Sequence, residues 1–146
     1  MKLTLRASLD ALPMLLDSAD SALHGYGIDD ESCATILLSI DEVFSNIILH
    51  GQLDASSDVI QFTLSPDKDG VSIDICDPGP PFDAAKAAHS AAASNGPISD
   101  IPIGGWGLLL VQAFTANIQY VRENSTNHIR LSFKLPLATD GVKSSV

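Results

Sequence analysis

A polar stripe runs along one predicted helix whose other side chains are mostly apolar. Glu42, Asn46 and His50 are spaced four residues apart, so an α-helix would stack them on one face. An asparagine amide oxygen can ligate Mg²⁺, and a glutamate one turn away can accept a proton from a hydroxyl or water. The pattern favours a magnesium–nucleotide site. A stripe of solvated polar side chains is the structural alternative.

Two other short stretches could face the same ligand. Asp77-Pro78-Gly79 ends a predicted strand, where a carboxylate can accept a hydrogen bond from an exocyclic amine such as that of adenine. Gly79 would let the backbone come close to a flat ligand. Gly104-Gly105-Trp106-Gly107 opens an apolar run, and its backbone N–H groups could bind an anion at the start of a helix. An ordinary turn and a tight helix start are the alternatives.

Several other kinds of site are disfavoured. The glycine stretch has neither the lysine and Ser/Thr of a Walker phosphate loop nor the dinucleotide spacing. No serine lies in a Gly-x-Ser-x-Gly frame. The other histidines show no ligand spacing around His50, which argues against zinc. Cys33 and Cys76 have no metal or redox spacing, so we expect buried thiols in a reducing cytoplasm.

Composition indicates one domain with a genuine core. The chain has 146 residues, of which 45% are hydrophobic, and a formal net charge of −10. Such acidity disfavours direct nucleic-acid binding, but it suits a basic protein partner or an anionic ligand that carries its own cation. No uninterrupted apolar run has the length of a membrane span, and the N-terminus is not a signal peptide. We therefore expect a cytoplasmic protein without a membrane segment.

The elements that must position these residues alternate between hairpins and single helices. The patterning predicts strands at 2–8, 59–64, 71–77, 118–122 and 128–135, and helices at 9–25, 29–50 and from about 107. Turns are expected at 66–70 and 124–127. This order predicts an α+β fold, a two-layer α/β sandwich whose mixed, mostly antiparallel sheet carries its helices on one face. Residues 1–136 would form the domain, 84–103 a lid, and 137–146 a flexible tail.

Taken together, the three stretches resemble the boxes of the histidine-kinase-like ATPases, and within them most closely those of the anti-sigma-factor serine kinases. Residues 41–51 look like the first box, Asp-Glu-x3-Asn-x3-His-Gly, 77–83 like the second and 102–108 like the third. Pro81 stands where the wider superfamily has a second glycine, a form that also occurs among anti-sigma-like members. The resemblance covers roughly residues 3–135 and implies a Bergerat-type fold that binds ATP with Mg²⁺.

The resemblance also implies roles for individual residues. Glu42 would be the catalytic base, Asn46 would hold Mg²⁺ and Asp77 would bind the adenine amine. The other residues that it implies at the nucleotide are His50, Gly79, Gly105, Trp106, Gly107 and Leu108. No role follows for Asn127, which sits where the family's last hairpin often has an asparagine.

The activity implied is that of a serine/threonine protein kinase. It would phosphorylate an anti-sigma-factor antagonist, sequester a sigma factor between phosphorylations and form a homodimer. Residues 84–107 carry only Lys86 as a fixed positive charge, whereas phosphoryl transfer usually uses cations beyond the metal. A non-catalytic ATP-binding module that switches partners is therefore the alternative. The catalytic half of a two-component histidine kinase is a third hypothesis, disfavoured because no phospho-acceptor helical region is present.

Overall fold

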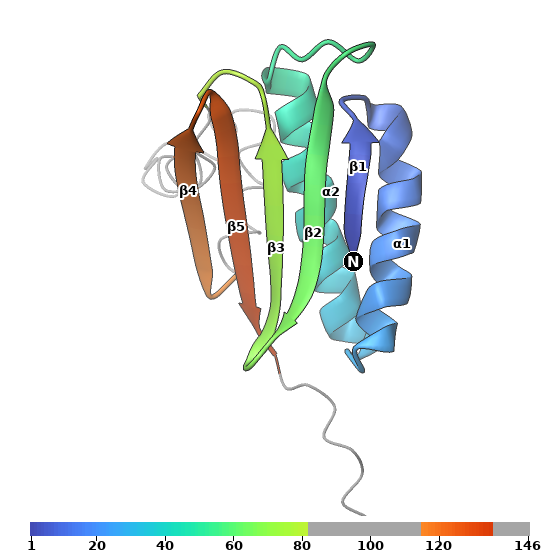
Figure 1. Ribbon diagram of the computed structural model, residues 1–146. Coiled ribbons are helices and arrows are strands. Elements are labelled where there is room, and N and C mark those ends of the chain that lie inside the picture. Colours follow the sequence, from blue (N-terminus) through green and yellow to red (C-terminus); the bar gives the residue numbers. More distant parts are fainter. Residues whose placement is uncertain (82–114, 136–146) are drawn as a thin grey trace, which may run out of the picture.

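The computed structural model describes residues 1–81 and 115–135 of the chain. The elements are β1 (Lys2–Arg6), a 3-10 turn η1 (Leu9–Ala11), α1 (Leu12–Gly25), α2 (Asp30–His50), β2 (Val59–Asp67), β3 (Gly70–Asp77), β4 (Asn117–Glu123) and β5 (Thr126–Lys134) (Figure 1). The predicted lid at 84–103, the third box at 102–108 and the tail at 137–146 lie outside the described residues.

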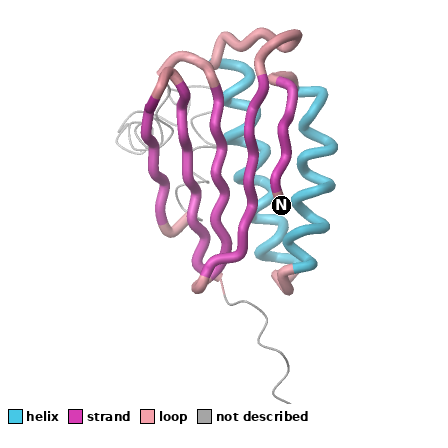
Figure 2. Tube along the Cα trace, viewed as in Figure 1, coloured by secondary structure: helices cyan, strands magenta, loops and turns pink. Residues whose placement is uncertain are grey.

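The strands form one five-stranded sheet in the order β1-β2-β3-β5-β4. Each neighbouring pair in this order is antiparallel. The helices α1 and α2 lie on the same side of the sheet, and no helix of the described residues covers the other face, which we call the open face (Figures 1 and 2). The predicted α+β class and the two-layer sandwich with helices on one face are therefore confirmed.

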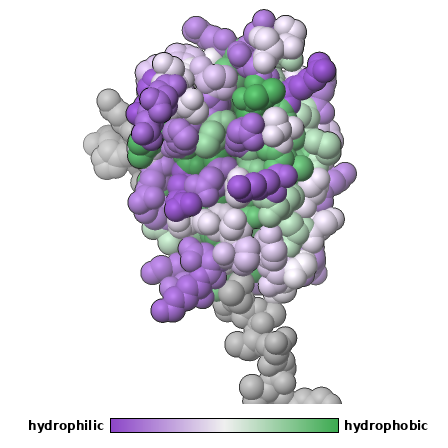
Figure 3. Space-filling view, viewed as in Figure 1, coloured by the Kyte–Doolittle hydropathy of each residue, from purple (hydrophilic) through white to green (hydrophobic). Residues whose placement is uncertain are grey.

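Strand alternation separates the core from the open face. In β3 the side chains of Val71, Ile73 and Ile75 are buried against the helices, while Ser72, Asp74 and Cys76 are partly exposed on the opposite face. On the open face, Asp74 accepts two hydrogen bonds from Arg130 of β5, at 2.7 and 2.9 Å. This face carries largely hydrophilic side chains (Figure 3).

The central helix α2 begins and ends where the sequence predicts. Asp29 is its N-cap, and the Asp29 carboxylate accepts a hydrogen bond from the Ser32 N–H at 2.9 Å. The helix ends at His50 with Gly51 as the C-cap. Its buried side chains follow helical spacing: Cys33, Ile36, Ser39, Ile40, Val43, Phe44, Asn46 and Ile47. The helix therefore presents its polar stripe next to the face that packs on the sheet.

By length and composition alone, α2 could also cross a membrane. It has 21 residues, and an 18-residue window within it has a mean hydropathy of 1.5. One such helix is a weak indication, since the core helix of a compact domain passes the same test. Here its fully buried Ile36, Ile40 and Phe44 belong to the cluster shared with the sheet, which accounts for its hydropathy.

Two predicted turns are shorter in the structure than expected. β2 continues to Asp67, so only Lys68 and Asp69 lie between it and β3. Pro66 is tolerated in the strand because β1 pairs with β2 only as far as Thr63, so β1 does not need the N–H that Pro66 lacks. In the last hairpin the turn consists of Asn124 and Ser125, both with positive φ, as in a type I′ turn. Thr126 and Asn127 thus belong to β5.

Candidate functional site

Asn46 is buried on α2 with its side chain in a fixed orientation. The residue is 6% exposed, and its Nδ2 donates a hydrogen bond to the backbone carbonyl of Glu42 at 2.7 Å. A carbonyl oxygen can pair only with the NH₂ end of an amide, so this bond defines which end of the side chain points where. The Oδ1 oxygen is the atom that Asn46 has left to ligate a cation.

Glu42 lies one turn before Asn46 and is partly buried. Burial, together with the negative charge of the adjacent Asp41, raises the pKa of the Glu42 carboxyl. Asp41 itself accepts a hydrogen bond from Ser45 Oγ at 3.0 Å. A carboxylate with a raised pKa is a stronger base, which suits Glu42 to accept a proton.

Asp77 is a buried carboxylate at the end of β3. The residue is 3% exposed, and its Oδ1 accepts hydrogen bonds from the Gly79 N–H at 2.9 Å and from Asn127 Nδ2 at 3.0 Å. These bonds compensate for the loss of water around the charge. Among the described residues these bonds use only one carboxylate oxygen, so Oδ2 could accept a hydrogen bond from a ligand.

Asn127 holds the turn after β3 in place. It pairs with Asp77 in the sheet and is 1% exposed. Its Nδ2 also donates to the carbonyls of Pro80 at 2.8 Å and Gly79 at 3.3 Å. Its Oδ1 accepts from Tyr120 Oη and from an Arg122 guanidinium nitrogen, both at 2.7 Å. Asn127 is therefore a structural partner of Asp77.

Sequence reasoning placed Asn127 in a turn, and the family resemblance implied no role for it. The two-residue turn instead puts Asn127 in the strand and in phase with Ile129, Leu131 and Phe133, which face the core. A polar residue at an inward position of a strand needs a buried hydrogen-bonding partner. The alternation of Asn127 with the apolar Ile129, Leu131 and Phe133 is therefore the feature of the sequence that could have predicted its buried role.

Two glycines join the turn after β3 to the end of α2. A Cβ placed on Gly79 would lie 2.8 Å from Asp77 Oδ1 and 3.0 Å from the Gly51 carbonyl oxygen. The Gly79 backbone is thus packed against the helix C-cap. A larger residue at position 79 would have to displace the Asp77 carboxylate or the Gly51 backbone. This contact brings the first and second boxes together, although 26 residues separate His50 from Asp77 along the sequence.

The remaining predicted residues fall into two groups. His50 is exposed on the last turn of α2. Gly105, Trp106, Gly107 and Leu108 lie outside the described residues. One cavity, of about 650 Å³, is lined by residues of β1 and η1, by Ser8, by Met14 of α1 and by residues 55–56, and none of the predicted site residues lines it.

The cysteines are only partly as expected. Cys33 is buried, but Cys76 is partly exposed because its position in β3 points to the open face of the sheet. There its Sγ lies 3.1 Å from His128 Nδ1 of β5. Both thiols are free.

Comparison with known proteins identifies one family, and the solved structures that are similar to this chain include two that bear on its fold. The family model of the histidine kinase-like ATPase domain matches residues 5–133. A solved structure of the RsbU and RsbW domains of Rv1364c from Mycobacterium tuberculosis is similar, with a TM-score of 0.62 and 19% identity. The match covers 93% of this chain and 33% of that one. This chain therefore spans about a third of the length of that relative.

The second relative is the histidine kinase domain from the Erythrobacter litoralis EL346 blue-light activated histidine kinase. It has a TM-score of 0.52 and 20% identity, and the match covers 85% of this chain and 61% of that one. At such identities the two structures support the fold. A search of curated proteins found no significant match.

Proposed function

Since the chain belongs to the histidine kinase-like ATPase domain family, we propose that it binds ATP with Mg²⁺ between α2 and the turn after β3. One observation supports this most: the buried Asp77 carboxylate is held by Gly79 and Asn127 through one oxygen, and its turn packs on the end of the helix that carries Asn46. Among the described residues the other oxygen, Oδ2, receives no hydrogen bond, so it can accept one from a ligand.

The residues fit the two ends of this ligand. Asp77 Oδ2 would accept a hydrogen bond from the adenine amine, and the rigid turn would fix the position of the base. Asn46 Oδ1 would ligate Mg²⁺, because its Nδ2 is already bonded to the Glu42 carbonyl. Bound Mg²⁺ would neutralise phosphate charge. Gly105, Trp106, Gly107, Leu108 and His50 complete the proposed site, and 84–103 is the proposed lid.

The finer proposal is an ATP-dependent serine/threonine protein kinase. Glu42 would take the proton from the hydroxyl of a protein substrate as that oxygen bonds to the γ-phosphorus and the bond to ADP breaks. The raised pKa of Glu42 supports this role. The sequence resembles the anti-sigma-factor serine kinases, so the proposed substrate is an anti-sigma-factor antagonist. The protein would be a cytoplasmic homodimer that sequesters a sigma factor between phosphorylations.

A non-catalytic ATP-binding module is the second candidate. In the part of the chain that the structure describes, Arg122 is the cation that contacts the turn after β3, and it already donates to Asn127 Oδ1 and to the Gly79 carbonyl, the latter at 2.8 Å. Because these hydrogen bonds hold the Arg122 guanidinium against the turn, it is less available to stabilise charge on a transferred phosphoryl group. Transfer assays separate this candidate from the kinase.

Thermal unfolding with and without Mg-ATP tests the binding site. A ligand at a hundred times its dissociation constant stabilises by about 2.7 kcal/mol, which means a rise in Tm of roughly 5–10 °C for a domain of this size. Asn46→Ala should abolish the magnesium-dependent part of the shift. Asn117→Ala, which removes an exposed asparagine of β4, should leave it unchanged. The proposal fails if Mg-ATP does not shift the wild type.

A further inference from the structure

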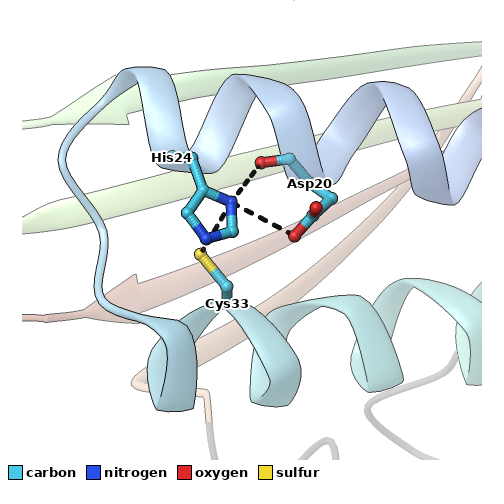
Figure 4. A group of neighbouring side chains, drawn as sticks. All are labelled: Asp20, His24 and Cys33. Carbon is cyan, nitrogen blue, oxygen red and sulfur yellow. Dashed lines mark hydrogen bonds and ion pairs between the residues drawn. The ribbon is translucent and has the colours of Figure 1, made fainter.

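A second group of possible ligand atoms lies where the end of α1 meets the start of α2, about two and a half helical turns before Glu42. Asp20 and His24 come from the last two turns of α1, and Cys33 comes from the first turn of α2. One ligand atom from each side chain lies within 4.8 Å of the other two. Figure 4 shows the His24 ring between the Asp20 carboxylate and the Cys33 sulfur. We propose that these three residues bind a zinc-like divalent cation.

The distances are close to those of a tetrahedral site. His24 Nδ1 lies 3.3 Å from Asp20 Oδ1 and 4.0 Å from Cys33 Sγ. With metal–ligand bonds of about 2.0–2.3 Å, neighbouring ligand atoms of a zinc tetrahedron are about 3.3–3.6 Å apart. The distance from His24 Nδ1 to Cys33 Sγ is therefore about 0.4–0.7 Å longer than in such a tetrahedron. Three protein ligands leave the fourth position to water.

A second carboxylate supports His24 in the way that metal-binding histidines are usually supported. His24 Nε2 lies 3.0 Å from Asp30 Oδ1 at the start of α2. A hydrogen bond from Nε2–H to this carboxylate would hold the ring orientation and leave Nδ1 for the metal. Nδ1 is now 2.9 Å from the Asp20 backbone oxygen, so binding would exchange this hydrogen bond for a metal bond.

The site can be reached from solvent and is negatively charged. The side chains of His24 and Asp20 are 46% and 47% exposed, whereas Cys33 is 2% exposed at the inner end of the cluster. Asp29 and Asp30 lie on the same helix start as Cys33 and add negative charge. Binding would displace the thiol proton of Cys33 to solvent and link α1 to α2 across their connecting turn.

Titration of the nucleotide-free full-length chain with Co²⁺ tests the proposal. A thiolate–cobalt charge-transfer band should appear in the near ultraviolet and be removed by Zn²⁺. Cys33→Ser should abolish this band. Asp20→Asn changes a half-exposed ligand without disturbing the core, and should weaken the apparent affinity for Co²⁺ at least about tenfold. Asp30→Asn should weaken it by about 10–100-fold, the usual cost of removing such a supporting partner.

Cys76→Ser is the matched control, since Cys76 is the other thiol with a histidine beside it. It should leave the cobalt band unchanged, and so should Asn46→Ala. The proposal is overturned if wild type gives no band, or if the band survives in Cys33→Ser. Because no nucleotide is present, a failure here is distinguishable from a failure of the ATP proposal.

Discussion

The ionised Glu42 side chain lowers the stability of the folded protein, and the same side chain is the proposed general base. Its partial burial and, to a lesser degree, the negative charge of Asp41 raise its pKa, so the charged form is less favourable here than in water. The same environment makes the carboxylate more basic, as a residue that accepts a proton from a hydroxyl requires. Replacing Glu42 therefore separates the kinase from the passive module.

Glu42→Gln should reduce phosphoryl transfer by about 10²–10⁴-fold, the usual contribution of a general base. The amide keeps the size of the side chain but cannot take up the hydroxyl proton. Transfer is measured as label moved from ATP to an antagonist protein, with Mg-ATP binding followed in parallel. Binding should persist in the variant. Transfer by wild type that Glu42→Gln leaves intact would exclude Glu42 as the base.

The same variant should stabilise the nucleotide-free and magnesium-free protein. Because folding raises the pKa of Glu42, the folded state holds this proton more tightly, and its contribution to stability is lost as pH rises through the folded pKa. The difference in free energy of unfolding between Glu42→Gln and wild type should thus grow with pH from near the ordinary value of 4.5 upward.

Urea unfolding between about pH 5 and about pH 7.5 measures this difference, in a range above the sequence pI of about 4.4. Glu123→Gln is the control, since it removes the charge of an exposed glutamate at the end of β4. A gain in stability that is equal in both variants would indicate relief of overall negative charge instead of a local effect at Glu42.

At the scale of the element, the β4–β5 hairpin supports the turn that carries Asp77. Tyr120 and Arg122 from β4 and Asn127 from β5 meet in one hydrogen-bond network. Arg122 and Asn127 both donate to the Gly79 carbonyl. A hairpin that follows the predicted lid in sequence thus shapes the proposed adenine end of the site.

Asn127→Ala should lower the free energy of unfolding by about 2–4 kcal/mol, because it leaves several buried polar groups without their partner. Mg-ATP should also bind more weakly, since Asp77 loses a donor. Chemical denaturation and titration calorimetry measure the two effects. Asn117→Ala on the same hairpin should change neither. Equal effects of the two variants would mean that the network does not hold the turn.

The sequence was most informative where local patterns and packing agree. The cap at Asp29, the helical spacing of the core residues and the stop at Gly51 all predicted α2 correctly. The last hairpin was predicted less well, because Asn124-Ser125-Thr126-Asn127 are all turn formers and only the sheet register shows that two of them continue the strand. The cluster of Asp20, His24 and Cys33 forms only when two helices pack together, so the spacing of these residues in the sequence does not predict it.

The whole molecule is strongly acidic, and this affects the proposed ligand. The net charge is −10. The proposed nucleotide site itself contains the carboxylates of Glu42 and Asp77, and Asp41 is adjacent to Glu42. Free ATP would be repelled by this field, whereas Mg-ATP carries less negative charge and brings its own cation. The protein should therefore bind ATP tightly only together with the metal.

Salt should relieve this repulsion. Raising the ionic strength from about 0.01 M to about 0.1 M shortens the Debye length from about 30 Å to about 10 Å. The affinity for ATP measured by calorimetry in the presence of a chelator should then increase, while the affinity for Mg-ATP should change less. Adenosine is the control, because it is neutral and should show little salt dependence. If metal-free ATP and adenosine respond equally to salt, the overall charge does not govern binding, and the need for magnesium would rest on its contact with Asn46 alone.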